Sequence, residues 1–592
     1  MRRPLPSLHY VVDARDGREH RFRVSLEIDR GARNAVDLFL PVWTPGSYLI
    51  REHQRHVGGV RARDAANGAP IAWHKTAKNR YRFEPPPGCT RLHVDYEVFA
   101  HELTVRTADL TEEHAFWNGV NLFLWPTDAR DAEATVDVLL PAGWRLFSAL
   151  PATREGSGVR LTARGLDQLA DSPALACADP VVFEFEAMGK PHRFVFDGMA
   201  GVELPADLVG DTRAVIEQAA RVFGLSSLPY DRYDFLVLAA DKGHGGLEHA
   251  DSSVLLVPRT GLATTKGYRD FLGLVAHEHF HVFNVKRMRP AELWQVDYGA
   301  ENHTTLLWVA EGFTAYYDDL LCRRAGVLPV ARYLQIVADN IADALRTPGR
   351  LVHSLAQASY DAWIKFYRPD EDSKNSSQSY YVDGGLAAMC IDLEIRRRTD
   401  GRRSLDDAMA HLWRSTWCVG RGFTEADVVE AISIAADADL GSFVRALVDG
   451  PFDPDFAAAL RPFGLVLAAA EPSAETPPFL GIQLQSGTTT IQSALRDGPA
   501  VRGGLSAGDE ILALGGLRVG ASTFDDVLRA VGRAGKPLTA LVARRGRVIT
   551  REVIPGAPSQ RGGCTLEVAP DSTPRQDALR RGWLGADQPR RE

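Results

Sequence analysis

The chain has 592 residues, of which 68 are basic and 76 acidic, and its formal charge is −8. At roughly 100–200 residues per domain, this length predicts three or four domains and excludes a single small module. With 45% hydrophobic and 24% charged residues, the composition is that of a globular protein and excludes global disorder. Because the net charge is negative and both signs are interspersed, nucleic acid is excluded as the principal partner.

The N-terminal sequence MRRPLPSLHYVVDARDG lacks the apolar run of a signal peptide, and no stretch approaches the roughly 18–20 apolar residues that span a bilayer. We therefore expect a cytoplasmic protein with no membrane partner, or a periplasmic one if the start is wrongly assigned. The six cysteines form no CxxC pair, so buried free thiols are expected rather than disulfides.

Residues 1–205 predict an N-terminal β-sandwich-like domain. Apolar residues alternate there, as in RFRVSLEI at 21–28 and LHVDYEVFA at 92–100, and period two indicates half-buried strands. The segment LPVWTPGSYLIREHQRHV at 40–57 interrupts this pattern with prolines and a glycine. It is either a simple turn or a structured loop in which Trp43 and Tyr48 brace a neighbouring domain.

From residue 206 the apolar period becomes helical and predicts a mainly helical domain over 206–470. A segment rich in Ala, Pro, Glu and Ser follows as a linker, and strands with one helix recur over 476–556. Residues 557–592 are rich in Pro, Arg, Gly and Asp and predict a mobile tail, to which CTLEV at 564–568 could add a short strand. Helices are expected at the segments 208–224, 268–287, 304–326, 330–346, 385–398 and 425–438.

The strongest chemical motif is HEHFH at 277–281, within the predicted helix 268–287. At 100° per residue, His277 and His281 lie only about 40° apart on the helix, so both imidazoles can reach one metal ion. Glu278 is placed to reach a metal-bound water rather than the metal, and His279 points to the other side.

A catalytic zinc site takes three protein ligands and leaves a position open for water. The best third donor is Glu311, which lies between apolar turns of the predicted helix 304–326. Asp318, seven positions further, shares its face on an ideal helix and could orient a ligand histidine, although it could equally be solvated. His244 and His249 lie in a glycine loop, and their HxxxxH spacing is only weak evidence that they bind a metal ion.

The sequences HEHFHVFNVKRMRP and ENHTTLLWVAEGFTAYYDDLL resemble the glycyl aminopeptidases, family sixty-one of the metallopeptidases in the gluzincin group. The resemblance extends to PVWTPGSYLIREHQRHV, FWNGVNLFLWP, GHGGLEHADSS and SYYVDGG, and covers most of the chain. It implies a thermolysin-like catalytic domain at 206–470, a single Zn²⁺ held by His277, His281 and Glu311, and Glu278 as the general base.

The resemblance also implies residues around the substrate. A tyrosine three residues before a glycine supplies the oxyanion donor in related enzymes, which selects Tyr381 over Tyr380. The basic residue usual before that glycine is Asp383 here, a departure from the pattern. In GGLEH, Gly245 and Gly246 let a peptide backbone approach as an added strand, and Glu248 could hold its terminal amine, or the segment is simply a turn.

Residues 476–556 resemble a PDZ domain. Phe479, Leu480, Gly481 and Ile482 match its carboxylate-binding loop, and GGLSAGDEILALGG matches its second common signature. The module either binds a peptide or protein C-terminus or packs on the catalytic domain and shapes access to it.

The sequence thus predicts a multidomain α+β protein that acts as a zinc aminopeptidase. By resemblance it removes N-terminal residues, Gly or Ala first, from peptides through attack of a metal-bound water. The alternatives are a zinc endopeptidase of the same chemistry and a non-catalytic scaffold that presents the PDZ module. No feature of the sequence indicates the oligomeric state.

Overall fold

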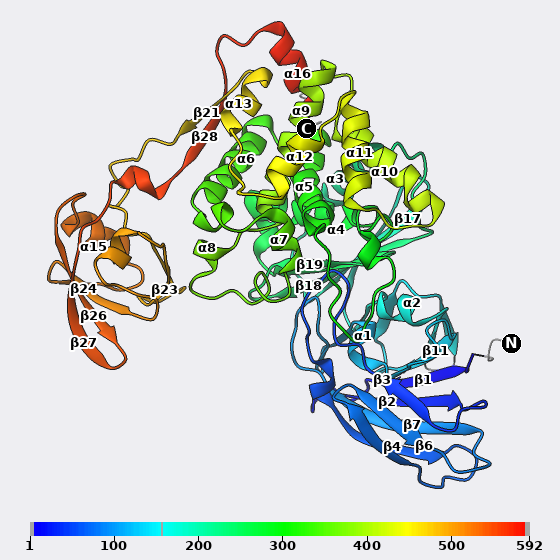
Figure 1. The fold of residues 1–592 in the computed structure, drawn as a ribbon. Coiled ribbons are helices and arrows are strands. Elements are labelled where there is room, and N and C mark those ends of the chain that lie inside the picture. Colours follow the sequence, from blue (N-terminus) through cyan, green and yellow to red (C-terminus); the bar gives the residue numbers. More distant parts are fainter. Residues whose placement is uncertain (1–4, 156–157, 586–592) are drawn as a thin grey trace. The chain divides into compact units, whose positions relative to one another are not determined.

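The computed structural model describes residues 5–155 and 158–585. Within this part the chain forms two compact units, one of 1–303 with 413–423 and one of 304–412 with 424–592. Figure 1 shows the elements of both units along the chain. The units do not follow the predicted domain boundaries, because the N-terminal region and the first part of the predicted peptidase domain lie in the same unit. No helix in the described ranges is both long and apolar enough to cross a membrane.

The N-terminal region is rich in sheets, as the alternating pattern predicted. In β2 (Arg21–Asp29), Phe22, Val24, Leu26 and Ile28 are buried on one face, and β2 pairs antiparallel with β7 (Arg91–Phe99). The largest sheet has the order β13-β14-β11-β1-β2-β7-β4, with β13 (Ala152–Glu155), β14 (Gly158–Ala163), β11 (Ala134–Leu139), β1 (Leu8–Asp13) and β4 (Val57–Asp64).

Two four-stranded sheets complete this region. One is β10-β3-β6-β5, made of β10 (Trp125–Pro126), β3 (Val36–Phe39), β6 (Arg80–Glu84) and β5 (Ala72–Ala77). The other is β12-β15-β9-β8, made of β12 (Arg145–Ser148), β15 (Ala174–Cys177), β9 (His114–Trp117) and β8 (Asp109–Leu110). Three short helices connect them: η1 (His53–His56), α1 (Gly119–Leu122) and α2 (Leu166–Ala170).

The segment 40–57 is more than a turn. The indole Nε1 of Trp43 donates to the backbone oxygen of Asp297 at 2.8 Å, and its ring lies 6.5 Å from that of Tyr298. The loop therefore braces a segment more than 250 residues further along the chain, as the second interpretation of its aromatic residues predicted.

A fourth, mixed sheet positions the site. Its order is β16-β17-β18-β20-β19, with β16 (Val181–Ala187), β17 (Lys190–Asp197), β18 (Tyr233–Ala240), β20 (Ser252–Pro258) and β19 (Gly245–Glu248). β18 is buried along almost its whole length, as expected of a central strand paired in parallel on both sides. Helix α4 (Thr265–Phe280) packs on this sheet, with the ring of Phe271 6.1 Å from that of Phe194. The remaining helices here are α3 (Leu208–Val222), η2 (Gly261–Ala263), η3 (Ala291–Leu293) and η6 (Trp417–Val419).

The second unit begins with a helical region, also as predicted. Its helices are η4 (Trp308–Gly312), α5 (Phe313–Arg324), α6 (Val330–Leu345), η5 (Pro348–Leu351), α7 (Leu355–Tyr360), α8 (Ser373–Ser376), α9 (Val382–Thr399), α11 (Glu425–Ala436), α12 (Gly441–Val448), α13 (Phe456–Leu460) and η7 (Arg461–Phe463). Helix α10 (Leu405–Ser415) lies where the chain passes between the two units.

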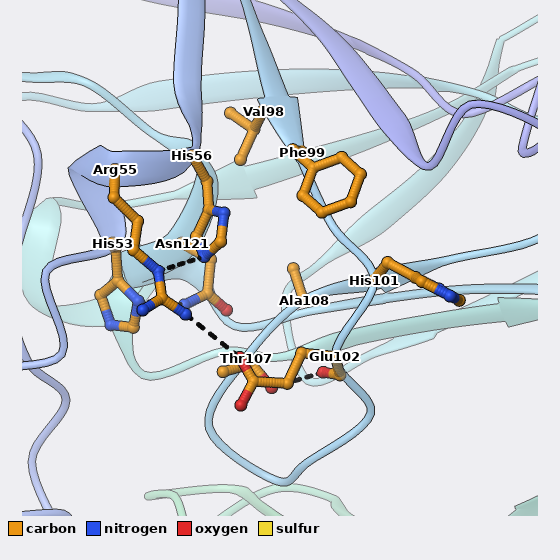
Figure 2. A pocket seen from close by; sticks show the side chains of 10 residues that line it. All are labelled: His53, Arg55, His56, Val98, Phe99, His101, Glu102, Thr107, Ala108 and Asn121. Atoms are coloured by element: carbon orange, nitrogen blue, oxygen red, sulfur yellow. Dashed lines mark hydrogen bonds and ion pairs between the residues drawn. The ribbon is translucent and has the colours of Figure 1, made fainter.

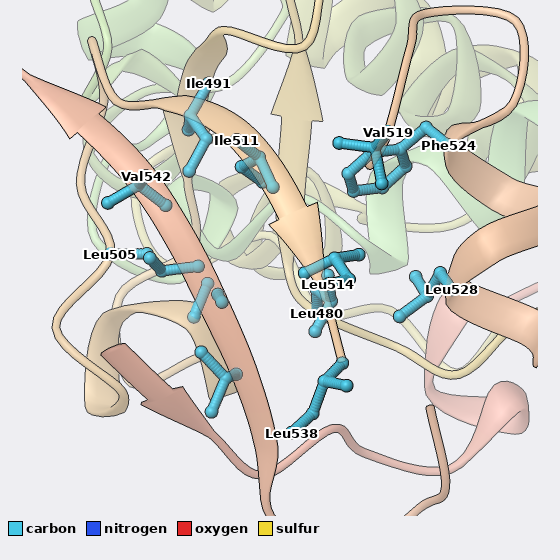
Figure 3. Close-up of a cluster of buried hydrophobic side chains, with 13 residues drawn as sticks. Leu480, Ile491, Leu505, Ile511, Leu514, Val519, Phe524, Leu528, Leu538 and Val542 are labelled. Carbon is cyan, nitrogen blue, oxygen red and sulfur yellow. The ribbon is translucent and has the colours of Figure 1, made fainter. Parts of the chain in front are cut away.

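The module at 476–556 has its own core of buried residues, among them Leu480, Ile511, Leu528 and Val542 (Figure 3). It contains the sheet β25-β24-β26-β27 and the pair β22-β23. The bounds are β22 (Ile482–Leu484), β23 (Ile491–Ala494), α14 (Pro499–Arg502), β24 (Glu510–Leu514), β25 (Leu517–Arg518), α15 (Phe524–Val531), β26 (Leu538–Arg544) and β27 (Arg547–Val553).

The prediction of a mobile tail from 557 is wrong for its described part. After η8 (Pro558–Arg561), strand β28 (Cys564–Val568) pairs with β21 (Leu465–Ala469), so the suggested strand at CTLEV exists. Helix α16 (Pro574–Leu584) buries Trp583 completely, and the indole donates to the Tyr316 hydroxyl at 2.9 Å. Residues 586–592 of the predicted tail lie outside the described ranges.

All six cysteines are free. Cys89, Cys177, Cys322 and Cys390 are buried, but Cys418 is exposed and Cys564 is half-buried, so the expectation of buried thiols is wrong for these two.

Candidate active site

Helix α4 presents the HEHFH motif at its end. Thr264 caps the helix by accepting a hydrogen bond from the Gly267 backbone N–H at 3.0 Å, and His277 and Glu278 lie in the last turn. The helix ends at Phe280 rather than at the predicted 287, but His281 keeps helical backbone angles. The rings of His277 and His281 therefore lie one turn apart, with centroids 4.7 Å from each other.

The backbone after the helix fixes the tautomer of His281. Its Nδ1 lies 2.8 Å from the backbone oxygen of Asn284. A carbonyl oxygen only accepts, so Nδ1 carries the proton and Nε2 keeps its lone pair for a metal. Val285 follows with a φ of +117°, a strained angle for a β-branched residue. The role of the Asn284 carbonyl could not be predicted from the sequence, since every residue has a backbone carbonyl.

His279 lies on the opposite side of α4, as predicted. It is completely buried and its Nε2 lies 2.8 Å from the Tyr230 hydroxyl, which in turn lies 2.7 Å from Nε2 of His192. Burial lowers the pKa of His279 well below its ordinary value, so the ring is neutral.

Strand β19 places the glycines of GGLEH against α4. It is the edge strand of its sheet and pairs antiparallel with β20 from Gly245 to Glu248. A Cβ atom at Gly246 would lie 2.0 Å from Oε1 of Glu278, so only glycine fits beside this carboxylate. Gly245 has a φ of +151°, which also favours glycine.

Glu248 lies close to the motif. It is 3% exposed, and the ligand atoms of Glu248, Glu278 and His281 all lie within 4.8 Å of one another. On another side, a Cβ atom at Gly46 would lie 2.3 Å from the Glu248 carboxylate, so the N-terminal loop closes tightly around this residue. This unit thus brings together a histidine and two acidic groups at the edge of a sheet.

His249 is held by a buried carboxylate that the sequence analysis did not single out. Asp171 lies 3.1 Å from Nδ1 of His249, accepts from the Ala250 backbone N–H at 2.8 Å and binds Lys286 at 2.6 Å. Although buried, Asp171 has its pKa held below the usual range by Lys286 and His249. His244 is exposed, and neither His244 nor His249 belongs to a group of described residues that could hold a metal ion.

In the second unit, Glu311 lies on η4, a π-helical turn that leads into α5, and is 1% exposed. Single π-helical turns are rare in proteins, and those that occur are often found at functional sites. Gly312 follows it and meets α9 so closely that a Cβ atom there would lie 2.7 Å from Gly384. This crossing explains the glycine three residues after Tyr381, and it holds η4 and the start of α9 together.

Tyr381 is the N-cap residue of α9 and is half-buried, whereas Tyr380 is completely buried. The ring of Phe366 stacks on Tyr381 at 5.2 Å. Tyr381 and Asp318 line one cavity of about 240 Å³. Of the two tyrosines, Tyr381 is therefore the one with access to a cavity.

Asp383 departs from the family pattern and is not a surface residue. It is 2% exposed and accepts a hydrogen bond from the Ser379 backbone N–H at 3.1 Å. Burial raises its pKa to about 7. It therefore shapes the start of α9 rather than offering the usual basic group.

A pocket of about 230 Å³ in the N-terminal region is lined by residues from the segments 53–56 and 98–108 and by Asn121 (Figure 2). His53 on η1 is 4% exposed and lies 3.2 Å from Nδ2 of Asn121 on α1, while Arg55 donates to Nε2 of His56 at 2.9 Å. None of these histidines belongs to a group of described residues that could hold a metal ion. The pocket therefore supplies no second metal centre.

The predicted carboxylate-binding loop precedes β22. Gly481 has a φ of +72°, Leu480 belongs to the buried core, and the backbone of Phe479 exchanges hydrogen bonds with Gly556. Ile482 begins β22, which pairs with β23 on one edge.

Comparison with known proteins agrees with the resemblance. Residues 9–178 match the family model of the Peptidase M61 N-terminal domain, and residues 270–387 match that of the M61 glycyl aminopeptidase. These two stretches of the chain therefore match the M61 glycyl aminopeptidase family, a family of peptidases. No curated protein matches it in sequence.

Among solved structures, the chain is similar to an aminopeptidase N family protein from Idiomarina loihiensis. The two share 27% identity with a TM-score of 0.90, over 98% of this chain and 100% of the other. An M1 zinc metallopeptidase from Deinococcus radiodurans, bound to a Tyr-Ser-Ala substrate, shares 18% identity with a TM-score of 0.48, over 76% of this chain and 95% of the other. A TM-score below 0.5 does not establish a shared fold, so only the first likeness defines the fold of this chain.

Proposed function

We propose that the protein is a zinc-dependent aminopeptidase that removes N-terminal residues, Gly or Ala preferred, from peptides. The observation that carries this proposal is the group of Glu248, Glu278 and His281, within 4.8 Å of one another at the edge strand of a sheet. A base, an amine-binding carboxylate and a metal ligand are thus available where an extended peptide can pair. The match of residues 270–387 to a peptidase family model supports peptides as the substrate class.

The proposed zinc ligands are His277, His281 and Glu311. Two imidazoles and a carboxylate are a common donor set of catalytic zinc sites, and His281 already has its Nε2 lone pair free of the proton. When bound, Zn²⁺ supplies Lewis acidity, which polarises a carbonyl and lowers the pKa of a water molecule.

In the proposed reaction, Glu278, Tyr381 and Glu248 each have a separate role. Glu278 takes the proton of the attacking water on its carboxylate and passes it to the leaving amine. The hydroxyl of Tyr381 donates a hydrogen bond to the oxygen that becomes negative during attack. Glu248 binds the cationic N-terminal amine, and the backbone of Gly245 and Gly246 pairs with the peptide as an added strand. The tight contact between Gly46 and Glu248 supports a preference for small first residues, since it restricts the space there.

The alternative function with the same chemistry is that of a zinc endopeptidase, in which Glu248 does not bind an N-terminal amine. The two are separated by the cleavage rates of an Ala-initiated peptide and its N-acetylated twin. We expect the acetylated peptide to be cleaved at least a hundredfold more slowly at the first bond, because it lacks the charged amine. Equal rates for the two peptides would refute the aminopeptidase and favour the endopeptidase.

For the module at 476–556 we propose a PDZ domain. Its closed core, the left-handed Gly481 and the strand β22 after the loop support this assignment. Contact within the unit favours the packed arrangement over a freely presented one, because Asn375 on α8 donates to the Ala494 carbonyl at 3.0 Å and accepts from the Arg496 N–H at 2.8 Å. A module held in this way can shape access to the helical region. This arrangement disfavours the alternative in which the protein is a non-catalytic scaffold that only presents the module.

A further inference from the structure

A polar cavity of about 480 Å³ lies in the first unit, beside the site but not part of it. One wall is Pro45, next to the Gly46 that contacts Glu248. Another wall comes from the segment after His281, which contributes Lys286 and Arg289. The cavity is therefore built from two motifs, PVWTPGSY and NVKRMRP, to which the proposed reaction gives no direct role.

Two acidic residues of this cavity already have a cationic partner. Asp167 forms a two-point ion pair with Arg130, at 2.6 and 2.9 Å, and Asp171 binds Lys286 at 2.6 Å. Asp131, the remaining acidic residue of the lining, is exposed to solvent. Each of these two pairs cancels one positive and one negative charge.

Arg289 is attracted by Asp171 and Asp167 only at longer range, and both of these carboxylates already pair with other cations. Its Nη2 donates to the backbone oxygen of Lys286, but its buried Nε has no hydrogen-bond partner, and no carboxylate in the described ranges forms an ion pair with it. Burial lowers the pKa of Arg289 from its ordinary value. A largely buried guanidinium that has no direct ion pair is costly in free energy, so an anion in the cavity would stabilise it.

Aromatic rings surround this guanidinium. Its central carbon lies 6.0 Å from the ring of Trp294, whose ring lies 6.1 Å from that of Trp417. Tyr298 forms a further wall and lies under Arg130 at 5.4 Å. Flat rings favour an organic ligand with a flat apolar part, whereas a bare inorganic anion would leave them without contacts.

We propose that this cavity binds a small organic carboxylate that has a flat apolar body. The carboxylate pairs with the guanidinium of Arg289 in the planar two-point geometry that this group favours, and the body packs against the rings of Trp294 and Trp417. Asp171 connects the cavity wall to the backbone of Ala250, two residues after Glu248. Binding of such a ligand does not require the proposed catalytic activity.

The test is a calorimetric titration of the full-length protein with phenylacetate, with its neutral analogue phenylacetamide and with inorganic phosphate. Each titration is carried out with the metal-loaded protein and after chelation, because a carboxylate could also bind the metal. We expect phenylacetate to bind equally in both forms, and phenylacetamide and phosphate to bind at least tenfold more weakly. Binding of phenylacetate that disappears after chelation, or stronger binding of phosphate, would overturn the proposal.

Arg289→Gln should weaken phenylacetate binding at least tenfold, whereas Arg289→Lys, which keeps the charge but loses the planar geometry, should weaken it less. Arg232→Gln is the matched control, since Arg232 lies in the same unit but does not line the cavity. If Arg289→Gln does not fold, the lysine variant still decides the question. Unchanged affinity in a folded Arg289→Gln or Arg289→Lys variant would refute the role of this residue.

Discussion

Gly246 determines the position of the Glu278 carboxylate. The contact distances of 2.0 to 2.5 Å from a Cβ atom at Gly246 to three atoms of Glu278 leave no room for any side chain at that position. The backbone angles of Gly246 are not of the left-handed kind, so the requirement for glycine there comes from space and not from conformation.

Gly246→Ala should therefore displace the Glu278 side chain with little effect on folding, because a flexible carboxylate can rotate away. We expect the peptide cleavage rate to fall by about 10²–10⁴, the range for loss of a general base, with the metal retained. Gly58→Ala is the control, since nothing lies within 4 Å of a Cβ atom there. Steady-state kinetics and thermal unfolding of both variants measure this, and a fully active Gly246→Ala enzyme would contradict it.

Asp383 makes a pH-dependent contribution to stability. Its pKa is about 7 in the folded chain against an ordinary value of 3.8, and burial is the main cause. A carboxyl whose pKa is raised by folding binds its proton more tightly in the folded state. Its unfavourable contribution therefore grows as the pH rises from about 4 to about 7 and is constant above that.

Asp383→Asn should accordingly stabilise the metal-free protein at pH 8 by about 2–4 kcal/mol and have little effect near pH 4. Urea unfolding of both proteins at the two pH values measures this difference. A variant that is less stable than the parent protein at pH 8 would show that the charged carboxylate has a favourable partner.

Some of the site residues could be predicted from the sequence and others could not. His277, Glu278 and His281 are predicted by helical spacing, and Glu311 by its place between apolar turns of a second helix and by the family resemblance; these roles remain predictions. The Asn284 carbonyl and the contact between Gly246 and Glu278 could not be predicted, because each depends on backbone geometry that no side chain signals.

At the scale of elements, the crossing of η4 and α9 places Glu311 and Tyr381 on adjoining segments. Gly312 and Gly384 approach so closely that a Cβ atom at either lies 2.7 or 3.1 Å from the backbone of the other. Gly312 directly follows Glu311, and Gly384 comes three residues after Tyr381. Because neither glycine has a side chain, the two segments can approach this closely.

Gly312→Ala should destabilise the protein by about 1–3 kcal/mol, the usual cost of an overpacked contact, and lower the peptide cleavage rate by shifting Glu311. Gly385→Ala is a matched control on the facing helix α9, where a Cβ atom would be at an ordinary distance of 3.4 Å from its nearest neighbour. Chemical unfolding and kinetics compare the two variants. If both substitutions lowered stability and the cleavage rate equally, the close contact between η4 and α9 at Gly312 would not be the cause.

The ends of elements were predicted less well than their existence. The helix predicted over 268–287 occupies Thr265–Phe280, because the chain turns after Phe280 and the Lys286 N–H binds the carbonyl of His281. Val282 and Phe283 remain buried after the turn, so apolar periodicity does not reveal where the helix ends.

At the scale of the whole molecule, the sheet-rich N-terminal region and the helical middle region could be predicted from the period of the apolar residues. The structure of the C-terminal tail could not be predicted, because its average composition does not indicate that one helix in it packs against the rest of the unit. Thr573 and Gln576 form a capping box at the start of α16, and Trp583 near its end is completely buried. The two-unit division also differs from the prediction, since apolar periodicity reports local structure and not which segments pack together.

The proposed reaction depends on a zinc ion, with separate roles for its ligands and for Glu278. The most direct measurement is zinc content and turnover in the same preparations of the parent protein, Glu278→Gln and Glu311→Ala. We expect one zinc per chain in the parent protein and in Glu278→Gln, turnover at least about a hundredfold lower in Glu278→Gln, and loss of zinc in Glu311→Ala. A fully active Glu278→Gln enzyme, or a parent protein that binds no zinc after reconstitution, would contradict the account.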